Sequence, residues 1–167
     1  NLPGMARAPG LAGLLIVRAA APQETGTYVD GTYVPIIYHF GGLSSVIPTE
    51  MLDRIDFYPG NFSTYFGRHT GGVIDVGVKD PTVKKEPKAH LRSADLIDAR
   101  TVVQGPLGDT GWNFAVAGRR SYVDVWLKPL LTELGSSVTT APVYYDYQAM
   151  LQRDWDKKKH SVRFFFF

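Results

Sequence analysis

The chain divides into two stretches with different patterns of apolar and polar positions. Residues 1–80 alternate short apolar runs with glycine-rich turns, which predicts short strands and short helices in a small mixed α/β unit. From residue 88 onward, apolar and polar residues alternate over aromatic-rich segments of about ten residues. This second pattern predicts roughly five long antiparallel strands, with a first reversal around residues 93–96.

Local signals place individual elements within the first stretch. The Asp30-Gly31 pair between two β-branched and aromatic runs predicts a tight hairpin. Residues 48–52 suit the first turn of a helix, and a helix of one to two turns is expected between Asn61 as its cap and Gly67 as its end. Strands are expected near residues 14–18, 26–29, 32–34, 55–58 and 73–78.

The turns of the second stretch differ in length. Strands are expected over residues 112–127, 143–155 and 160–167. The connections at residues 105–111 and 154–159 are short, whereas the one at residues 128–142 is long. Weakly alternating segments joined by turns that are short on one side and long on the other are typical of a transmembrane β-barrel.

The glycines after residue 60 raise the alternative of a phosphate-binding loop. Gly67 and Gly72 have the spacing of the two glycines in G-x-x-x-x-G-K-[ST]. Val73 and Ile74 occupy the positions where such a loop needs its lysine and its hydroxyl, and the strand-like alternation of residues 73–78 replaces the required helix. We therefore reject nucleotide binding at this position.

Composition excludes several other classes. The chain of 167 residues has no cysteine, which excludes a disulfide framework and thiolate metal sites. The net charge is +2, with five Lys/Arg against seven Asp/Glu in residues 1–80 and thirteen against nine in residues 81–167. This mild balance shows no clustered basic face, so nucleic-acid binding is not expected. The apolar run at residues 11–17 is far shorter than the ~20 residues of a membrane-spanning helix.

A collinear set of short motifs resembles TonB-dependent outer-membrane receptors. In the first stretch these are LPG at 2–4, VR at 17–18, VDG at 29–31, IP-x-E at 47–50, DRID at 53–56, PG at 59–60, FG at 66–67 and GGVI at 71–74. Their order and spacing are similar to those of the family's plug domain. QGPLG at 104–108, GRRSY at 118–122 and YYDY at 144–147 resemble the first barrel strands of one branch.

The resemblance implies a fold and a function. Residues 1–83 would be an N-terminally truncated plug, an α+β unit with a small mixed sheet and short helices, and residues 84–167 the first antiparallel strands of an incomplete transmembrane β-barrel. Such receptors lie in the bacterial outer membrane and take up scarce large solutes such as iron chelates, cobalamin or glycans. The energy comes from the TonB complex, whose coupling box is missing from this chain. The resemblance also implies contact with outer-membrane lipid. It implies neither a cofactor nor an enzymatic activity.

The resemblance also suggests roles for particular residues. The plug-motif positions taken as structural are Arg18, Asp30, Gly31, Pro59, Gly60, Gly67, Gly71 and Gly72. The residues that an apical loop would present to a solute are Tyr33, Tyr38, His39 and Phe40, for which packing is the alternative.

Five charged residues have alternatives that stay open. Arg18 and Arg54 would form either plug-to-wall contacts or ion pairs within the plug. Arg119 and Arg120, with Asp124 on the same strand, would either line the lumen or mark a strand end. The four histidines show no metal-ligand spacing, so no metal site is expected.

A rival hypothesis comes from another class of protein. The same aromatic-rich strands suit a soluble secreted β-rich module that recognises glycans through tyrosine and tryptophan. Five strands with open edges are not tolerated in hydrocarbon, so the chain alone should not form a working pore under the first hypothesis. The receptor hypothesis requires one face of the strand-rich second stretch to contact lipid, whereas the soluble-module hypothesis does not.

Overall fold

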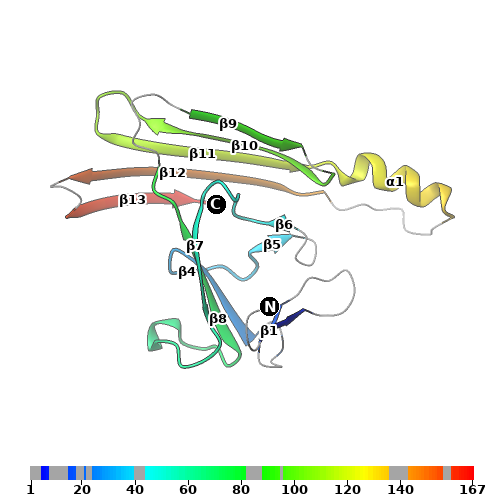
Figure 1. Cartoon of the computed structure of the whole chain (residues 1–167), viewed down its shortest axis with the longest axis horizontal. Coiled ribbons are helices and arrows are strands. Elements are labelled where there is room, and N and C mark those ends of the chain that lie inside the picture. Colours follow the sequence, from blue (N-terminus) through cyan, green and yellow to red (C-terminus); the bar gives the residue numbers. More distant parts are fainter. Residues whose placement is uncertain are drawn as a thin grey trace. The chain divides into compact units, whose positions relative to one another are not determined.

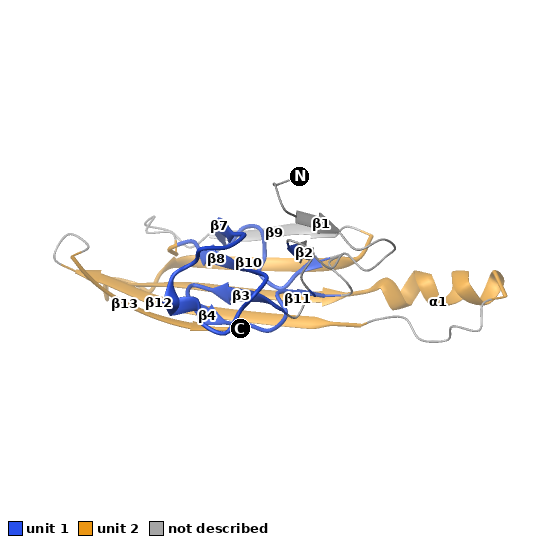
Figure 2. Ribbon diagram, turned by 90° about the horizontal axis from the view of Figure 1, so that it is seen from below, with its two compact units in different colours: residues 1–79 blue, residues 80–167 orange. Residues whose placement is uncertain are grey.

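The computed structural model describes residues 5–7, 15–17, 21, 24–39, 44–81, 88–94, 96–135, 143–155 and 159–167. The chain forms two compact units, Asn1–Lys79 and Asp80–Phe167, which Figure 2 shows in different colours. Each unit has its own sheet, and each is described by itself.

Unit 1 is built on a four-stranded mixed sheet with the order β4-β3-β8-β7. Its strands are β3 (Thr25–Val29), β4 (Thr32–Tyr33), β7 (Leu52–Tyr58) and β8 (Gly72–Val78). Strand β8 runs parallel to β3 and antiparallel to β7, and every one of its residues is buried. A central strand covered on both faces explains the nearly continuous apolar run of this segment.

Two small hairpins and one short helix complete the described part of unit 1. Strand β1 (Met5–Arg7) pairs with β2 (Leu15–Val17), and β5 (Tyr38–His39) pairs with β6 (Ser44–Ser45), both antiparallel. The core of the unit contains these buried side chains: Val17, Tyr28, Val29, Ile47, Met51, Val73, Ile74, Val76 and Val78.

Two helix predictions for this unit were wrong in detail. The helix after residue 60 is a single 3₁₀ turn, η3 (Thr64–Phe66), and its cap is Ser63, whose hydroxyl accepts from the Tyr65 N–H at 3.3 Å. Asn61 instead has a positive φ of 55°, a conformation that asparagine tolerates better than most residues. Residues 48–51 form only turns before β7 begins at Leu52.

Unit 2 is a five-stranded antiparallel meander with the order β13-β12-β11-β10-β9 (Figure 1). Its strands are β9 (Lys88–Ala94), β10 (Asp98–Pro106), β11 (Trp112–Ser121), β12 (Tyr145–Trp155) and β13 (His160–Phe166). The reversal between β9 and β10 falls where the sequence predicted it. The β10–β11 turn uses Gly108 and Gly111 at positive φ of 57° and 77°.

The two faces of this sheet differ in chemistry. We call one the polar face; its buried members are Asp98, Val102, Asn113, Ala115, Ala117, Arg119, Ser121, Asp146, Gln148, Met150 and Gln152. We call the other the apolar face; it presents Trp112, Phe114, Val116, Arg120, Tyr145, Tyr147, Ala149, Leu151, Arg153, Trp155, Val162, Phe164 and Phe166, all half-exposed or exposed. The polar face is therefore the covered one, the reverse of the usual arrangement in a water-soluble sheet.

The strand predicted over residues 112–127 ends at Ser121 and is followed by a helix, α1 (Val123–Glu133). The helix contains Pro129, and the indole N–H of Trp126 donates to the Leu96 carbonyl at 2.8 Å, which ties α1 to the β9–β10 turn. Over the described residues, no helix combines the length and apolar character needed to cross a bilayer.

Candidate functional site

The Asp30-Gly31 turn of unit 1 is fastened to the central strand β8. Its two residues have positive φ angles of 46° and 76°, as a two-residue hairpin turn requires. The Asp30 N–H donates to the Val76 carbonyl at 2.9 Å, and the Asp30 carboxylate accepts from the Val78 N–H at 3.0 Å. The Gly31 N–H donates to Asp75 Oδ1 at 3.1 Å. The turn is thus held by side-chain oxygens from two aspartates.

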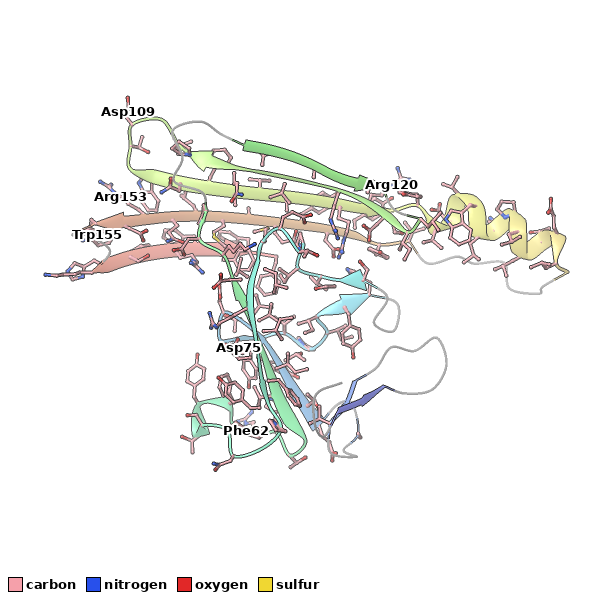
Figure 3. All side chains as sticks on the ribbon, viewed as in Figure 1. Phe62, Asp75, Asp109, Arg120, Arg153 and Trp155 are labelled. Carbon is pink, nitrogen blue, oxygen red and sulfur yellow. The ribbon has the colours of Figure 1, made fainter. Side chains whose placement is uncertain are left out.

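Asp75 also connects β8 to β7 through Arg54. Arg54 Nη2 lies 3.4 Å from Asp75 Oδ2, and Arg54 Nε donates to Asp56 Oδ2 at 2.7 Å (Asp75 is labelled in Figure 3). The hydrogen bond to Asp56 raises the pKa of Arg54 above its usual value, so the guanidinium stays charged. These ion pairs lie within unit 1, which is the second of the two alternatives for Arg54. Arg18 lies outside the described residues.

Asp75 and Gly77 were not among the residues predicted from the sequence, although a signal for Asp75 was present. Asp75 is the single charged residue in the apolar run of β8, and its side chain is only 9% exposed. A carboxylate in such a run needs partners, and the Gly31 amide and Arg54 supply them. Gly77 leaves room for the arginine, because a Cβ there would lie 2.7 Å from Arg54 Cγ.

An aromatic cleft of about 430 Å³ lies beside β3 in unit 1. It is lined by Tyr28, Tyr33, Gly67, Arg68 and His69. The Tyr28 hydroxyl and His69 Nε2 lie 3.0 Å apart, and the Tyr33 ring stacks on His69 with centroids 5.6 Å apart. Burial raises the pKa of the Tyr28 phenol. Tyr33 is thus packed against His69 and 53% exposed.

Two of the other residues expected to face a solute lie in a different sheet from Tyr33. Tyr38 and His39 form β5 and are half-buried, and burial raises the pKa of Tyr38. Phe40 lies outside the described residues. The described members of the candidate solute-facing set are therefore divided between β4 and β5, and the structure adds Arg68 and His69 to the surroundings of Tyr33.

The motif glycines Gly72 and Gly67 differ in whether the surrounding structure leaves room for a side chain. At Gly72 a Cβ would lie 2.7 Å from Val17 Cγ1 and 3.0 Å from the Tyr58 carbonyl oxygen, so the chain approaches closely there. Gly67 was expected to be required by the helix end, but its φ is −56° and a Cβ would meet only the Thr64 carbonyl at 3.5 Å.

The remaining motif positions show simpler environments. Gly71 is buried and its N–H donates to the Glu24 carbonyl at 3.1 Å. Pro59 and Gly60 follow β7 in a bend. These contacts are with backbone, as expected of residues that shape the chain.

The polar face of unit 2 contains a buried charge cluster. Arg119 Nε donates to Asp146 Oδ2 at 2.7 Å, and its Nη1 lies 3.8 Å from Asp98 Oδ2. The Tyr144 hydroxyl donates to Asp98 Oδ2 at 2.7 Å, and the Arg119 guanidinium lies 5.3 Å from the centroid of the Tyr144 ring. The side chains of Arg119, Asp98 and Asp146 are only 1%, 3% and 7% exposed. Three charges with shared hydrogen bonds make a rigid polar patch.

Arg119, Arg120 and Asp124, expected to act together on one strand, are separated. Arg119 lies on the polar face, whereas Arg120 lies on the apolar face with its guanidinium 5.7 Å from the Tyr145 ring centroid. Asp124 is in the first turn of α1, where a negative charge favours the helix. The prediction that Asp124 belongs to the strand was wrong, because the strand ends three residues earlier.

The charged side chains of the two sheets serve to join neighbouring strands. Within the part of the chain that the structure describes, no group of three or more histidine and acidic side chains is placed to hold a metal ion. Both charge clusters join neighbouring strands through ion pairs and hydrogen bonds. Each cluster therefore stabilises the sheet to which it belongs.

Comparison with known proteins relates this architecture to solved receptors. No family model matches the chain, and no curated protein matches it. The siderophore receptor PirA from Pseudomonas aeruginosa matches 98% of the chain with a TM-score of 0.59 and 20% identity. A mutant of the ferric enterobactin receptor PfeA from the same organism matches 91% of the chain with a TM-score of 0.53 and 18% identity.

The similarity is one of fold. The chain spans 29% of the length of PirA and 27% of that of PfeA. A mixed sheet followed by antiparallel strands, in this order, is shared with these receptors. The resemblance to TonB-dependent receptors that the sequence motifs indicated is confirmed at this level.

Proposed function

We propose that the chain is the plug, residues 1–83, and the first barrel strands, residues 84–167, of a TonB-dependent outer-membrane receptor. The solute is an iron chelate, and the chain has no enzymatic role. Uptake is driven by the TonB complex acting on a segment outside this chain. Support comes from the fold shared with two siderophore receptors and from the motif order along the sequence.

The observation that carries the proposal is the chemistry of the two faces of the unit 2 sheet. The covered face contains Arg119, Asp146 and Gln148, while the exposed face presents Val116, Phe164 and similar side chains. In water this arrangement is unfavourable, since exposed apolar area costs about 25 cal/mol per Å². In a transmembrane barrel the same arrangement is required, because the outer face meets lipid and the inner face is polar.

The solute is taken to be an iron chelate because PirA is described as a siderophore receptor and PfeA as a ferric enterobactin receptor. Tyr33, Tyr38, His39 and Phe40 remain the proposed solute-facing residues. Tyr33 is supported by its exposed ring beside Arg68 and His69, since a cationic and aromatic surface suits an anionic chelate.

Gene deletion in the host organism tests the function. Deletion should abolish uptake of one class of radiolabelled ferric siderophore while leaving the others unchanged, and a protonophore should abolish the same uptake in the parent strain. Membrane fractionation should recover the protein with the outer membrane. Unchanged uptake of every ferric chelate tested would contradict the proposed solute class.

Size-exclusion chromatography separates the proposal from the glycan-binding alternative. A soluble β-rich module should refold in buffer as a compact monomer. The proposed receptor segment should aggregate in buffer, because its apolar face is exposed there, and should be dispersed by detergent. A monomeric peak without detergent would favour the soluble module.

A further inference from the structure

A groove lies at the end of the apolar face where β11 begins and β12 ends. It has a volume of about 640 Å³ and is lined by Trp112, Arg153, Trp155, Val162 and Phe164. The pairing register places Trp112 beside Arg153 on the neighbouring strand, and Arg153 beside Val162 on the next. Figure 3 shows Arg153 and Trp155 at the same end of the sheet as Asp109, in the β10–β11 turn. Three strands therefore contribute one continuous concave surface.

Aromatic rings hold the shape of this groove. The Trp112 and Phe164 rings are stacked with centroids 6.4 Å apart, and Trp155 stacks on His160 at 5.9 Å. The Arg153 guanidinium lies 5.9 Å from the Trp112 ring centroid. Such stacking fixes side chains that would otherwise rotate freely, so the groove is largely formed before any ligand arrives.

Among the residues that the structure describes, Arg153 is the one charged residue that lines the groove. Its guanidinium lies over the Trp112 ring, and among the described residues it forms no ion pair with a carboxylate. Asp154, the neighbouring residue on β12, lies on the polar face and accepts from Gln152 at 3.2 Å. The guanidinium therefore keeps donors available for an anion within a mostly apolar groove.

We propose that this groove binds the head group of an anionic phospholipid, with the phosphodiester on Arg153. The proposal rests on the proposed function, because it requires the apolar face to meet a bilayer. A guanidinium presents a fork of donors that matches a phosphate in two parallel hydrogen bonds. Val162 and Phe164 provide the apolar wall that the glycerol and first acyl carbons need, and a free phosphate ion would leave that wall unused. The occupant is therefore a lipid rather than inorganic phosphate.

The opposite end of the apolar face provides a matched comparison. Arg120 lies over the Tyr145 ring there, and its shallower pocket of about 350 Å³ contains no tryptophan. Both arginines belong to the same face and lie over an aromatic ring. Replacing either one removes one positive charge, but only Arg153 lies in the groove between Trp112 and Trp155.

The first experiment tests whether the apolar face is in lipid. Because five strands with open edges are not tolerated in hydrocarbon, the complete receptor proposed to contain this chain is used, with its tryptophans other than Trp112 and Trp155 replaced by phenylalanine. It is reconstituted in phosphatidylcholine bilayers that contain lipid brominated along its acyl chains. Quenching of both tryptophans is expected. Absence of quenching would contradict the proposed function itself, independently of any head-group preference.

The second experiment tests the head-group site. The same variant is placed in bilayers with a small fraction of phosphatidylglycerol that carries a nitroxide at the head group, and quenching is compared with that by equally labelled phosphatidylcholine. A preference of about fivefold for phosphatidylglycerol is expected, which corresponds to the ~1 kcal/mol of one basic side chain near an anionic surface. Arg153→Gln should reduce the ratio to about one, and Arg153→Lys should restore part of it. Arg120→Gln should leave it unchanged.

The other possible results also distinguish the proposed lipid site from its alternatives. A ratio of one in the starting variant, or an equal loss in Arg120→Gln, would overturn the site while leaving the bilayer placement intact. Displacement of the labelled lipid by excess inorganic phosphate would assign the site to free anion instead. Unchanged quenching by acyl-chain bromine in Arg153→Gln shows that the variant is still folded and inserted, so a lost preference then reflects the missing guanidinium.

Discussion

Replacing Gly72 with alanine should destabilise unit 1 by packing rather than by backbone strain. The new Cβ would lie 2.7 Å from Val17 Cγ1, about 1 Å inside the ~3.5–4.0 Å separation that carbon atoms prefer. It would also lie 3.0 Å from the Tyr58 carbonyl oxygen, a backbone atom of the neighbouring strand that cannot rotate away. Val17 is fully buried, so its side chain has little room to move. Overpacking of this kind costs about 1–3 kcal/mol.

The assay is hydrogen exchange of the peptide covering β8, followed by mass spectrometry, in the full chain at increasing urea concentration. Gly72→Ala should lower the free energy of unfolding of this segment by ~1–3 kcal/mol. Gly67→Ala is the matched control, because its φ is −56° and its Cβ meets only one carbonyl at 3.5 Å. A compatible Gly→Ala change stabilises by about 0.4–1 kcal/mol through the unfolded chain, so the two variants should differ in sign.

A second substitution tests the cause. Val17→Ala alone removes two buried methyl groups and should cost about 1.6 kcal/mol at ~0.8 each. In the Gly72→Ala background it also removes the atom that the new methyl would strike, so the double variant should be less destabilised than the sum of the single variants, by ~0.5 kcal/mol or more. Strict additivity, or a Gly72→Ala variant as stable as Gly67→Ala, would refute the packing argument.

Three further outcomes are expected. Arg119→Gln should destabilise the sheet of unit 2 by ~3–5 kcal/mol in detergent thermal melts, because Asp146 would be left buried without its cation, and adding Asp146→Asn should recover part of the loss. In urea unfolding of the full chain between pH 8 and 11, the stability of unit 1 should fall as the pH rises above about 10, since burial raises the pKa of Tyr28 above its usual value of 10.0. Tyr28→Phe should reduce this dependence. Val116→Lys should cost ~2–4 kcal/mol of stability in lipid, whereas Val125→Lys on exposed α1 should cost almost nothing; an equally harmless Val116→Lys would contradict a lipid-facing position.

Elements specified by neighbouring residues could be predicted from the sequence. The Asp30-Gly31 turn followed from two residues that tolerate positive φ between β-prone runs. The strands of unit 2 followed from period-two alternation, which survives even when both faces contain some apolar residues. In each case the signal lies within a window of about ten residues, so no knowledge of distant contacts was needed.

Contacts between distant residues left little trace in the sequence. Asp75 is 44 residues from Gly31 and 21 from Arg54, so the network that fastens the turn is visible only after β3 and β8 pair in parallel. The same holds for Arg119 and Asp146, which are 27 residues apart. Periodicity could assign these residues to faces, but not to partners.

Helix α1 shows how a local signal can mislead. Val123, Val125 and Leu127 alternate with other residues and continue the pattern of β11, so the sequence was interpreted as one long strand. The helix has no side-chain cap at Tyr122 and contains Pro129, two features that argue against a helix on propensity alone. The tertiary bond from the Trp126 indole to the Leu96 carbonyl compensates locally, and no pattern within the segment signals it.

The position of α1 also bears on which membrane leaflet the Arg153 groove would meet. Trp126 ties the helix to the β9–β10 turn, so the longest connection of unit 2 lies at that end of the sheet, as Figure 1 shows. The β10–β11 turn lies at the other end, with Arg153 and Trp155 (Figure 3). Outer-membrane barrels have their longer loops outside the cell and their short turns in the periplasm. On the proposed function, α1 is therefore extracellular, and the Arg153 groove opens toward the periplasmic leaflet, where its phosphate ligand would be that of a phospholipid.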